Sequence, residues 1–306
     1  MNGIATAAAP AAAAMGGRTP QKLLVGLIGA GIQRSLTPAM HEEEARCQGL
    51  RLHYQLIDLD RTGVGPEALP MLIEAARVMG FAGLNITYPC KQAVIPLLDA
   101  LSDEARAMGA VNTVVFRDGR AIGHNTDGSG WAWGFRRTLP QADLSRVVLL
   151  GAGGAGSAIA HAVLRLGARQ LVVVDSDAAR AQAAAAALDA AYGPGRVSAS
   201  ADVGAALAGA SGLIHATPTG MDKLPGLPLP VDALRPALWV AEIVYFPLDT
   251  ALLRAARQRG CATVDGGTMA AGQAIGAFEL FTGRAADAGR VEAHLRRMLA
   301  ERSDAA

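Results

Sequence analysis

Cysteine, net charge and long apolar runs are all scarce in this 306-residue chain. The three cysteines, Cys47, Cys90 and Cys261, are odd in number and widely spaced, so they fit neither a disulfide framework nor a zinc site. The six histidines lack metal-ligand spacing as well, and no metal is predicted. Reduced thiols are typical of the cytoplasm, which is therefore the expected location.

The balance of charges argues against two classes of partner. Lys and Arg together number 28, Asp and Glu 27, and the formal net charge is +1. Such a chain lacks the basic surface that binds nucleic acid or an anionic membrane, so neither is expected as a partner. It also lacks the run of about 18 apolar residues that a membrane span needs.

The remaining composition is that of a globular protein, with 51% hydrophobic and 18% charged residues. The chain is longer than a single hydrophobic core usually supports, so two domains are expected. Residues 1–20 are rich in Ala, Gly and Pro and lack the charged start and Leu-rich stretch of a secretory signal. We predict a disordered tail over residues 1–21, in which Met15 offers an alternative start.

Strand and helix signals alternate from Lys22 onwards. Short apolar runs that end at Gly, Pro or Asp predict strands at 23–28, 52–57, 83–87, 110–116, 121–123, 146–150, 170–174, 197–199, 212–215, 239–243 and 263–264. Helices are predicted at 38–48, with Thr37 as N-cap, and at 69–79, 92–98, 103–108, 130–139, 157–166, 178–191 and about 269–299. Asp118-Gly119 predicts a hairpin turn. The alternation indicates an α/β fold, with a largely parallel sheet in the first half and a doubly wound sheet in the second.

A glycine-rich turn follows the predicted strand at 146–150. It reads GAGGAG, a GxGxxG fingerprint with a strand before it and a helix after it. The first glycine permits a tight turn, the second lets backbone N–H groups approach a pyrophosphate, and the third lets the helix pack closely. The helix N-terminus then faces the phosphate charges. The predicted dinucleotide-binding residues are Gly151, Ala152, Gly153, Gly154, Ala155 and Gly156.

Asp175 ends the next predicted strand, about 20 residues after Gly156. A carboxylate at this position accepts hydrogen bonds from the adenosine ribose hydroxyls of NAD and opposes the 2′-phosphate of NADP. Asp177 adds further negative charge, whereas Arg180 on the following helix is the feature that favours NADP. An Asp here also suits a helix N-cap. The predicted cofactor is NAD, with Asp175 and Arg180 in its site.

The first half carries polar groups at the ends of its predicted strands, in the segments 35–38, 85–87, 91, 112–113 and 125–127. Open α/β sheets bind ligands at the carboxyl ends of their strands. Hydroxyl and amide groups suit a polyhydroxylated small molecule, and Lys91 and Asp127 remain for chemistry. Taken singly, each group has a commoner structural explanation, because lysines are usually exposed and Ser, Thr, Asn and Asp often form turns and caps.

Seven segments in order give a more specific indication. They are 29–41 (GAGIQRSLTPAMH), 83–91 (GLNITYPCK), 109–113 (GAVNT), 123–128 (GHNTDG), 151–156 (GAGGAG), 216–221 (ATPTGM) and 266–273 (GGTMAAGQ). Over nearly all of residues 22–300 the chain resembles the shikimate dehydrogenase family. It looks most like the NAD-dependent quinate/shikimate dehydrogenases, because Thr37 stands where strictly biosynthetic members usually carry a second Ser. Asp175 likewise replaces their Asn-Arg-Thr type of NADP signature.

The resemblance implies roles for individual residues. Lys91 and Asp127 correspond to the catalytic pair. The substrate would be bound by Ser35 and Thr37 at its carboxylate, by Thr87, Asn112 and Gln273 at its ring hydroxyls, and by Tyr245. The segments 216–221 and 266–269 would lie near the nicotinamide, with Thr217, Gly266 and Met269 in the cofactor site. Two departures from the family pattern are Cys90, in place of an aromatic residue or His, and His215, in place of an Asn.

The expected chemistry is the reversible oxidation of quinate, shikimate or both to the 3-dehydro acid, in a catabolic setting. A hydride passes to the nicotinamide and a proton to a base. Lys91 would take that proton or stabilise the alkoxide as a cation, and Asp127 would orient it. The sequence leaves both roles of the lysine open.

We expect a substrate-binding domain over 22–125 plus 267–306 and an inserted Rossmann NAD-binding domain over 126–266. Three alternatives stay open: an NADP-dependent biosynthetic shikimate dehydrogenase, an aminoshikimate-type relative, and a non-catalytic dinucleotide sensor. The presence of Lys91 and Asp127 argues against the sensor. A tetrahydrofolate-type dehydrogenase fits the clusters at 35–37 and 125–127 poorly. Monomer and homodimer are both compatible with the sequence.

Overall fold

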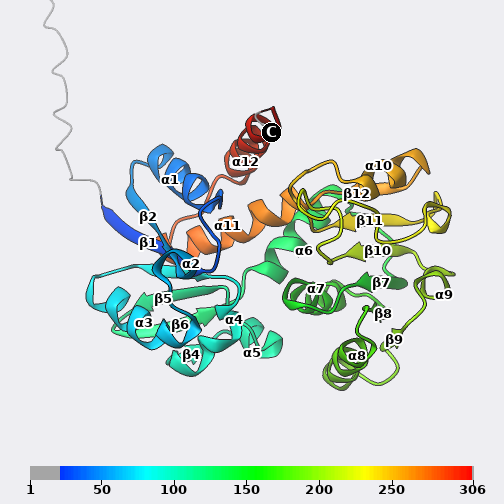
Figure 1. Ribbon diagram of the computed structural model, residues 1–306, viewed down its shortest axis with the longest axis horizontal. Helices are drawn as coiled ribbons and strands as arrows, with labels where there is room; N and C mark the ends of the chain where they lie inside the picture. The colour runs from blue at the N-terminus through cyan, green and yellow to red at the C-terminus, as the bar shows by residue number, and fades with distance from the viewer. Residues whose placement is uncertain (1–20, 305–306) are drawn as a thin grey trace, which may run out of the picture.

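Two six-stranded sheets organise the molecule. The computed structural model describes residues 21–304, so the tail predicted over residues 1–21 lies outside the described part except for Gln21. Figure 1 shows the sheets in two lobes, with α6 (Asp127–Thr138) and α11 (Gly266–Thr282) between them. The predicted α/β fold with two sheets is confirmed. The domain boundaries near residues 126 and 266 stay a prediction.

The first sheet comes from the N-terminal half of the chain. Its strands are β1 (Lys22–Gly29), β2 (Arg51–Asp58), β3 (Gly83–Ile86), β4 (Ala100–Leu101), β5 (Thr113–Arg117) and β6 (Arg120–His124), in the order β2-β1-β3-β5-β6-β4. β5 runs antiparallel to β3 and β6, whereas the other pairings are parallel. The sheet is therefore mixed, which corrects the expectation of a largely parallel one. The predicted hairpin causes this: Asp118 and Gly119 have φ angles of 52° and 74°, and they reverse the chain in two residues.

The helices around this sheet follow the predicted order with two local corrections. They are α1 (Thr37–Cys47), α2 (Leu59–Thr62), α3 (Leu69–Val78), α4 (Cys90–Ala93) and α5 (Asp103–Met108), with 3₁₀ turns η1 (Pro66–Ala68) and η2 (Ile95–Leu97). The helix predicted at 92–98 is instead split into α4 and η2, because Pro96 has no N–H to continue an α-helix. Thr37 is the first helical residue rather than the N-cap, which is Leu36.

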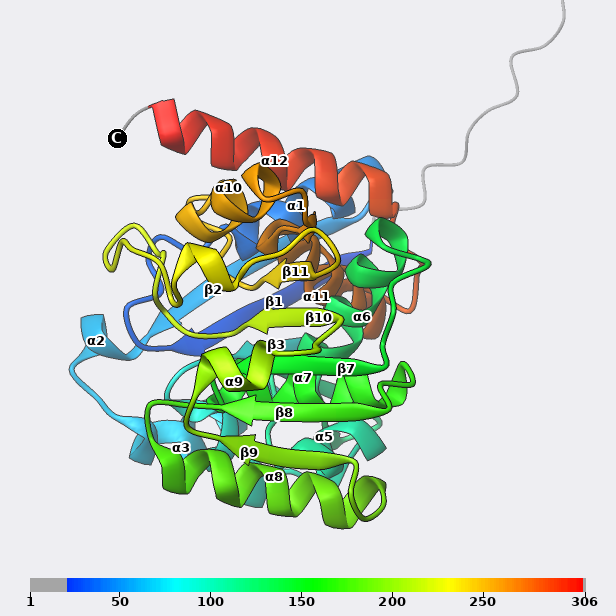
Figure 2. The same ribbon diagram turned by 90° about the vertical axis from the view of Figure 1, so that its right-hand side faces the viewer.

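The second sheet is parallel throughout. Its strands are β7 (Arg146–Leu150), β8 (Gln170–Val174), β9 (Val197–Ser200), β10 (Gly212–His215), β11 (Trp239–Glu242) and β12 (Ala262–Val264), in the order β12-β11-β10-β7-β8-β9. Figure 2 shows β11, β10, β7, β8 and β9 side by side in this order. The chain moves outward from β7 through β9 and then returns to place β10 on the other side of β7. This reversal is the doubly wound arrangement predicted, and sheets of this kind bind their ligands at the carboxyl ends of the strands where it occurs, here β7 and β10.

Helices cover both faces of the second sheet. They are α7 (Gly154–Arg165), α8 (Ala178–Tyr192), α9 (Val203–Leu207) and α10 (Ala251–Gln258), with the 3₁₀ turn η3 (Val231–Ala233). Along β7, Val147 and Leu149 pack into a core with Ile159 of α7, whereas Val148 and Leu150 pack into another with Leu252 of α10. A strand buried on both faces is continuously apolar, which explains its sequence, Arg-Val-Val-Leu-Leu.

α6 and α11 cross at a pair of glycines. A Cβ atom on Gly130 would lie 2.4 Å from the backbone nitrogen of Gln273, and one on Gly272 would lie 2.4 Å from the carbonyl oxygen of Gly130. Only glycine lets two helix backbones approach so closely. The crossing joins the two lobes through rigid helices and fixes where Asp127, the first residue of α6, lies.

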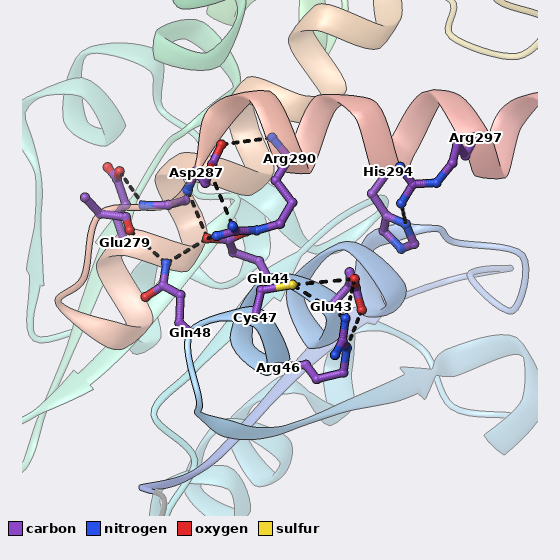
Figure 3. A network of polar contacts seen from close by, with 12 residues as sticks. Glu43, Glu44, Arg46, Cys47, Gln48, Glu279, Asp287, Arg290, His294 and Arg297 are labelled. Atoms are coloured by element: carbon purple, nitrogen blue, oxygen red, sulfur yellow. Dashed lines mark hydrogen bonds and ion pairs between the residues drawn. The ribbon is translucent and has the colours of Figure 1, made fainter. Parts of the chain in front are cut away.

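The C-terminal tail forms two helices rather than the single one predicted at 269–299. α11 ends at Gly283, whose φ of 67° is left-handed, and α12 (Ala288–Asp304) then packs on α1. The carboxylate of Glu44 on α1 is 1% exposed and accepts hydrogen bonds from Arg290 Nε at 2.7 Å, from Arg290 Nη2 at 2.8 Å and from the N–H of Asp287 at 2.9 Å (Figure 3). This ion pair, with its carboxylate buried, fixes the start of α12 on the last turn of α1.

Three further properties bear on the function classes considered above. Within residues 21–304, no helix is both long and apolar enough to cross a membrane. No group of three or more His, Cys, Asp or Glu in the same part of the chain is arranged to hold a metal ion. All three cysteines are free, with Cys47 exposed and Cys90 and Cys261 buried.

Candidate functional site

An ammonium and a carboxylate meet where the first sheet passes into α6. Lys91 lies in α4, just beyond the end of β3, and Asp127 begins α6. The Nζ atom of Lys91 is 2.5 Å from Oδ2 of Asp127, and their side chains are 26% and 11% exposed. The pair is thus partly desolvated but accessible, which suits a group that exchanges a proton with a ligand.

A chain of buried polar groups holds Asp127 from behind. Asn112 Nδ2 donates to Asp127 Oδ1 at 2.8 Å and to Thr126 Oγ1 at 3.0 Å, and Asn112 Oδ1 accepts the N–H of Thr126 at 2.8 Å. The chain continues from Asn112 through Thr113 and Asn85 to the hydroxyl of Tyr54. Both amide hydrogens of Asn112 are therefore engaged within the protein, and they orient the carboxylate. The sequence did not single out the role of Tyr54 or Thr126.

The segment that carries Ser35 and Thr37 is held by a carboxylate that sequence reasoning missed. Asp58, 3% exposed at the end of β2, accepts the N–H groups of Gly31 at 3.0 Å and Ile32 at 3.2 Å and the Nε2 of Gln33 at 2.9 Å. Burial alone would raise the pKa of Asp58, but these hydrogen bonds bring it below its ordinary value. Its position at a strand end was the available signal.

Three other predicted substrate residues surround this region less directly. Thr87 follows β3 and packs against Gly29, where a Cβ atom would lie 2.3 Å from Thr87 Cγ2. Gln273 lies at the crossing of α11 with α6, and Tyr245 is 44% exposed beyond β11. Among residues 21–304, no hydrogen bond joins Tyr245 or Gln273 to Lys91 or Asp127.

Arg302 links the loop that carries Ser35 to the loop that carries Tyr245, and the sequence analysis did not predict this contact. Its Nη1 donates to the carbonyl oxygen of Arg34 at 3.2 Å, and its Cζ lies 4.5 Å from the ring centroid of Phe246. Arg34 precedes Ser35, and Phe246 follows Tyr245. The guanidinium of α12 therefore ties the loop before α1 to the loop after β11.

The glycine-rich turn has the shape expected of a phosphate cradle. Gly151 has a φ of 99°, and a Cβ atom on Gly156 would lie 2.0 Å from the carbonyl oxygen of Gly151, so neither position accepts a side chain. Gly153 and Gly154 are exposed, with open space around their Cα atoms. Because α7 begins at Gly154, its first-turn N–H groups have no intrahelical acceptor. The turn fits the pyrophosphate of a dinucleotide.

The start of α6, which carries Asp127, packs against α7, which follows the glycine-rich turn. A Cβ atom on Gly128, next to Asp127, would lie 2.9 Å from the carbonyl oxygen of Ala158 in α7. The start of α6 thus rests on the helix that carries the turn.

Asp175 is fully engaged by the protein. Its Oδ2 accepts the N–H of Ala152 in the glycine-rich turn at 2.8 Å, and Arg180 contacts both carboxylate oxygens, at 3.1 Å and 2.5 Å. The hydrogen bond from Arg180 is the largest cause that lowers the pKa of Asp175 well below its usual range. The N-cap of α8 is the neighbouring Asp177, so Asp175 does not serve as that cap.

Two of the remaining predicted cofactor residues, Thr217 and Gly266, follow the carboxyl ends of strands β10 and β12, whereas the third, Met269, is buried. Thr217 follows β10 and lies beside Gly151, where a Cβ atom would come 3.1 Å from Thr217 Cγ2. Gly266 begins α11 against the carbonyl oxygens of Ile243 and Val244, at 2.3 Å and 2.5 Å from a Cβ atom. Met269 is 8% exposed and belongs to the core of the second sheet.

Comparison with known proteins agrees with this architecture. Residues 27–114 match the family model of the shikimate dehydrogenase substrate binding domain. The shikimate dehydrogenase (NADP(+)) of Streptomyces avermitilis is 59% identical, over 90% of this chain and 96% of that protein. The quinate/shikimate dehydrogenase (NAD(+)) of Corynebacterium efficiens is 47% identical, over 89% and 96%. The structure of quinate dehydrogenase from Corynebacterium glutamicum in complex with NAD superposes with a TM-score of 0.85 at 45% identity, over 89% of this chain and 98% of that one.

Proposed function

The chain belongs to the shikimate dehydrogenase family, and we propose that it oxidises quinate, shikimate or both to the 3-dehydro acid with NAD as its preferred cofactor. The observation that carries the proposal is the contact between Lys91 and Asp127, backed by Asn112, at the start of a helix that rests on α7. The proposal assigns substrate binding to residues 22–125 plus 267–306 and dinucleotide binding to residues 126–266. Catabolic use of these acids is the proposed setting.

The residues of the pair act on the proton of the substrate alcohol. The nicotinamide, when bound, supplies the hydride acceptor. Lys91 Nζ takes the proton of the substrate hydroxyl or stabilises the negative charge that develops on the oxygen of that hydroxyl. Asp127 holds the ammonium in place. Asn112 holds Asp127 in turn, so the pair is oriented before the substrate arrives.

The substrate residues complement an acid with several hydroxyl groups. Ser35 and Thr37 donate hydroxyl hydrogens to the carboxylate from a loop that Asp58 fixes. Thr87, Gln273 and Tyr245 supply further hydrogen bonds to the ring substituents. Asn112 takes part by exchanging its hydrogen bond to Thr126 for one to the substrate.

The preference for NAD rests on Asp175. Its carboxylate lies at the end of β8, where the adenosine ribose of a dinucleotide is bound in this fold. Arg180 is paired with both of its oxygens, so its positive charge is balanced before any cofactor binds. A 2′-phosphate would have to separate this pair and approach a buried carboxylate, which is unfavourable. Ribose hydroxyls carry no charge, so they avoid this like-charge repulsion.

A second candidate is a shikimate dehydrogenase that uses NADP. The side chain of Arg180 is 50% exposed in the first turn of α8, which leaves it free to turn from Asp175 toward a 2′-phosphate. The 59% identical relative from Streptomyces avermitilis, a shikimate dehydrogenase named for NADP(+), supports this alternative.

Initial rates with quinate and with shikimate, each with NAD and with NADP, test the two candidates. We expect the highest rate with NAD. Rates that are highest with NADP on shikimate would reject the NAD proposal in favour of the second candidate. Replacing Asp175 by Asn removes the negative charge, and we expect it to reduce the ratio of NAD to NADP turnover by about tenfold or more.

The role of Lys91 has its own test. We expect Lys91→Ala to lower kcat by about 10²-fold or more, the scale of one acid–base group. Lys22→Ala is the matched control, because Lys22 is exposed at the start of β1, whereas Lys91 lies beyond the end of the parallel strand β3. A Lys91→Ala rate within about threefold of wild type would remove Lys91 from the mechanism.

A further inference from the structure

A buried acid–base pair lies at the carboxyl edge of the second sheet, and the mechanism above does not use it. His215 ends β10 and Glu242 ends the neighbouring β11, and the parallel register sets these two residues side by side. Both side chains are 0% exposed, and His215 Nδ1 lies 2.8 Å from Glu242 Oε1. Burying such polar groups is costly unless every one is hydrogen-bonded, so their partners are informative.

The partners of Glu242 determine where the proton lies on the imidazole ring. Oε1 accepts the N–H of Ile243 at 2.8 Å and that of Val244 at 3.0 Å, and Oε2 accepts the hydroxyl of Thr250 at 3.0 Å. Backbone N–H groups only donate, so the carboxylate acts as an acceptor. His215 therefore carries a hydrogen on Nδ1 and presents Nε2 on the opposite side of its ring.

Nε2 of His215 contacts the side chain of Thr217. Nε2 and Thr217 Oγ1 are 2.5 Å apart. The Cγ2 methyl of Thr217 would lie 3.1 Å from a Cβ atom on Gly151, so this partly buried side chain stands next to the glycine-rich turn. When the ring carries only the Nδ1 proton, Nε2 accepts the hydroxyl hydrogen of Thr217. The hydroxyl oxygen also accepts the N–H of Thr219 at 3.4 Å, which leaves it one lone pair for a donor from a bound ligand.

We propose that His215 and Glu242 are positioning residues that hold the Thr217 hydroxyl as a hydrogen-bond acceptor for the carboxamide amino group of the nicotinamide. The inference rests on the proposed function, because it takes a nicotinamide dinucleotide as the ligand of the glycine-rich turn. The buried pair touches no ligand itself. It acts through the rotamer of Thr217, and Glu242 fixes the ring that sets this rotamer.

Dinucleotide binding tests the proposal without turnover. Calorimetry on the intact protein compares NAD with its 3-acetylpyridine analogue, in which a methyl group replaces the amino group of the carboxamide. We expect wild type to bind NAD about three- to tenfold more tightly than the analogue, the contribution of one hydrogen bond. Thr217→Val and His215→Asn are each expected to lose this preference. The double variant is expected to lose no more than either single one, because both residues serve one contact.

Two variants guard against an indirect effect. Thr217→Val leaves the buried pair intact, so it tests the hydroxyl even if His215→Asn fails to fold. His161→Asn is the matched control: His161 is 7% exposed, and its Nδ1 lies 2.9 Å from the hydroxyl of Tyr192. This control is expected to keep the preference for NAD over the analogue.

The outcomes separate the inference from the proposed function. If Thr217→Val, or a folded His215→Asn, keeps the wild-type preference for NAD over the analogue, the inference is wrong. If such a variant shows only a lower Tm, His215 and Glu242 have a purely structural role. If wild type binds NAD but does not distinguish it from the analogue, the inference is again wrong while the proposed function stands. If wild type binds neither NAD nor NADP, the proposed function itself fails.

Discussion

Replacing His41 by Phe is expected to make the protein less sensitive to acid. His41 lies on α1 and is 1% exposed, with its ring 5.1 Å from that of Tyr54 and 5.8 Å from that of Phe281. Neither ring nitrogen has a hydrogen-bond partner among residues 21–304. Burial lowers the pKa of His41 from 6.5 to about 3, because a charged imidazole in this apolar site would be desolvated.

The sign and size of the effect follow from this shift. Below pH 6.5 the unfolded chain binds a proton at His41 that the folded protein does not bind until about pH 3, so the free energy of unfolding falls as pH falls through this window. One pKa unit corresponds to about 1.4 kcal/mol. Between pH 7 and pH 5 the contribution of His41 is therefore a loss of about 2 kcal/mol. A phenyl ring cannot take up the proton, so His41→Phe removes this loss.

Urea unfolding of wild type and His41→Phe at pH 7 and at pH 5 measures this loss of free energy of unfolding. Other titrating groups affect both proteins alike and cancel in the difference. His53→Phe is the control for exchanging a histidine for a phenyl ring at a surface position, because the side chain of His53 is 68% exposed. If wild type and His41→Phe lose the same free energy of unfolding between pH 7 and pH 5, the assignment of a buried neutral His41 is refuted.

Two further substitutions test the framework of the site. Gly272→Ala places a methyl group 2.4 Å from the carbonyl oxygen of Gly130, and urea unfolding should show a loss of about 1–3 kcal/mol, whereas Gly289→Ala, with its nearest neighbour at 3.5 Å, should change little. Asp58→Ala releases the loop that carries Ser35, and steady-state kinetics should show KM for the acid substrate raised about three- to tenfold, with a smaller change in kcat. An unchanged KM would mean that the loop keeps its conformation without Asp58.

Local patterns were sufficient where a short segment determines its own conformation. The hairpin at Asp118-Gly119 and the strand–turn–helix around Gly151 agree with their sequence predictions because positive φ angles and apolar runs act within a few residues. The errors are local too. Pro96 divides the helix predicted at 92–98, and Gly283 divides the one predicted at 269–299.

Partners that are distant in the sequence could not be predicted in the same way. Their places at strand ends made Lys91 and Asp127 candidates for chemistry, but their pairing came from resemblance to a family, since nothing local relates residues so far apart. The hydrogen bonds of Asp58 to the loop at Gly31–Gln33 depend on β1 and β2 being neighbours. The Arg302 contact with Arg34 depends on α12 packing on α1.

By itself, the sequence determined the alternation of strands and helices, the dinucleotide turn and the chemistry available to each side chain, because these follow from backbone sterics and functional groups. Tertiary structure decided which groups meet. The register of β10 with β11 sets His215 against Glu242, and the crossing of α6 with α11 fixes the position of Asp127. Buried polar groups must find partners, and those partners are determined by packing between elements rather than by sequence spacing.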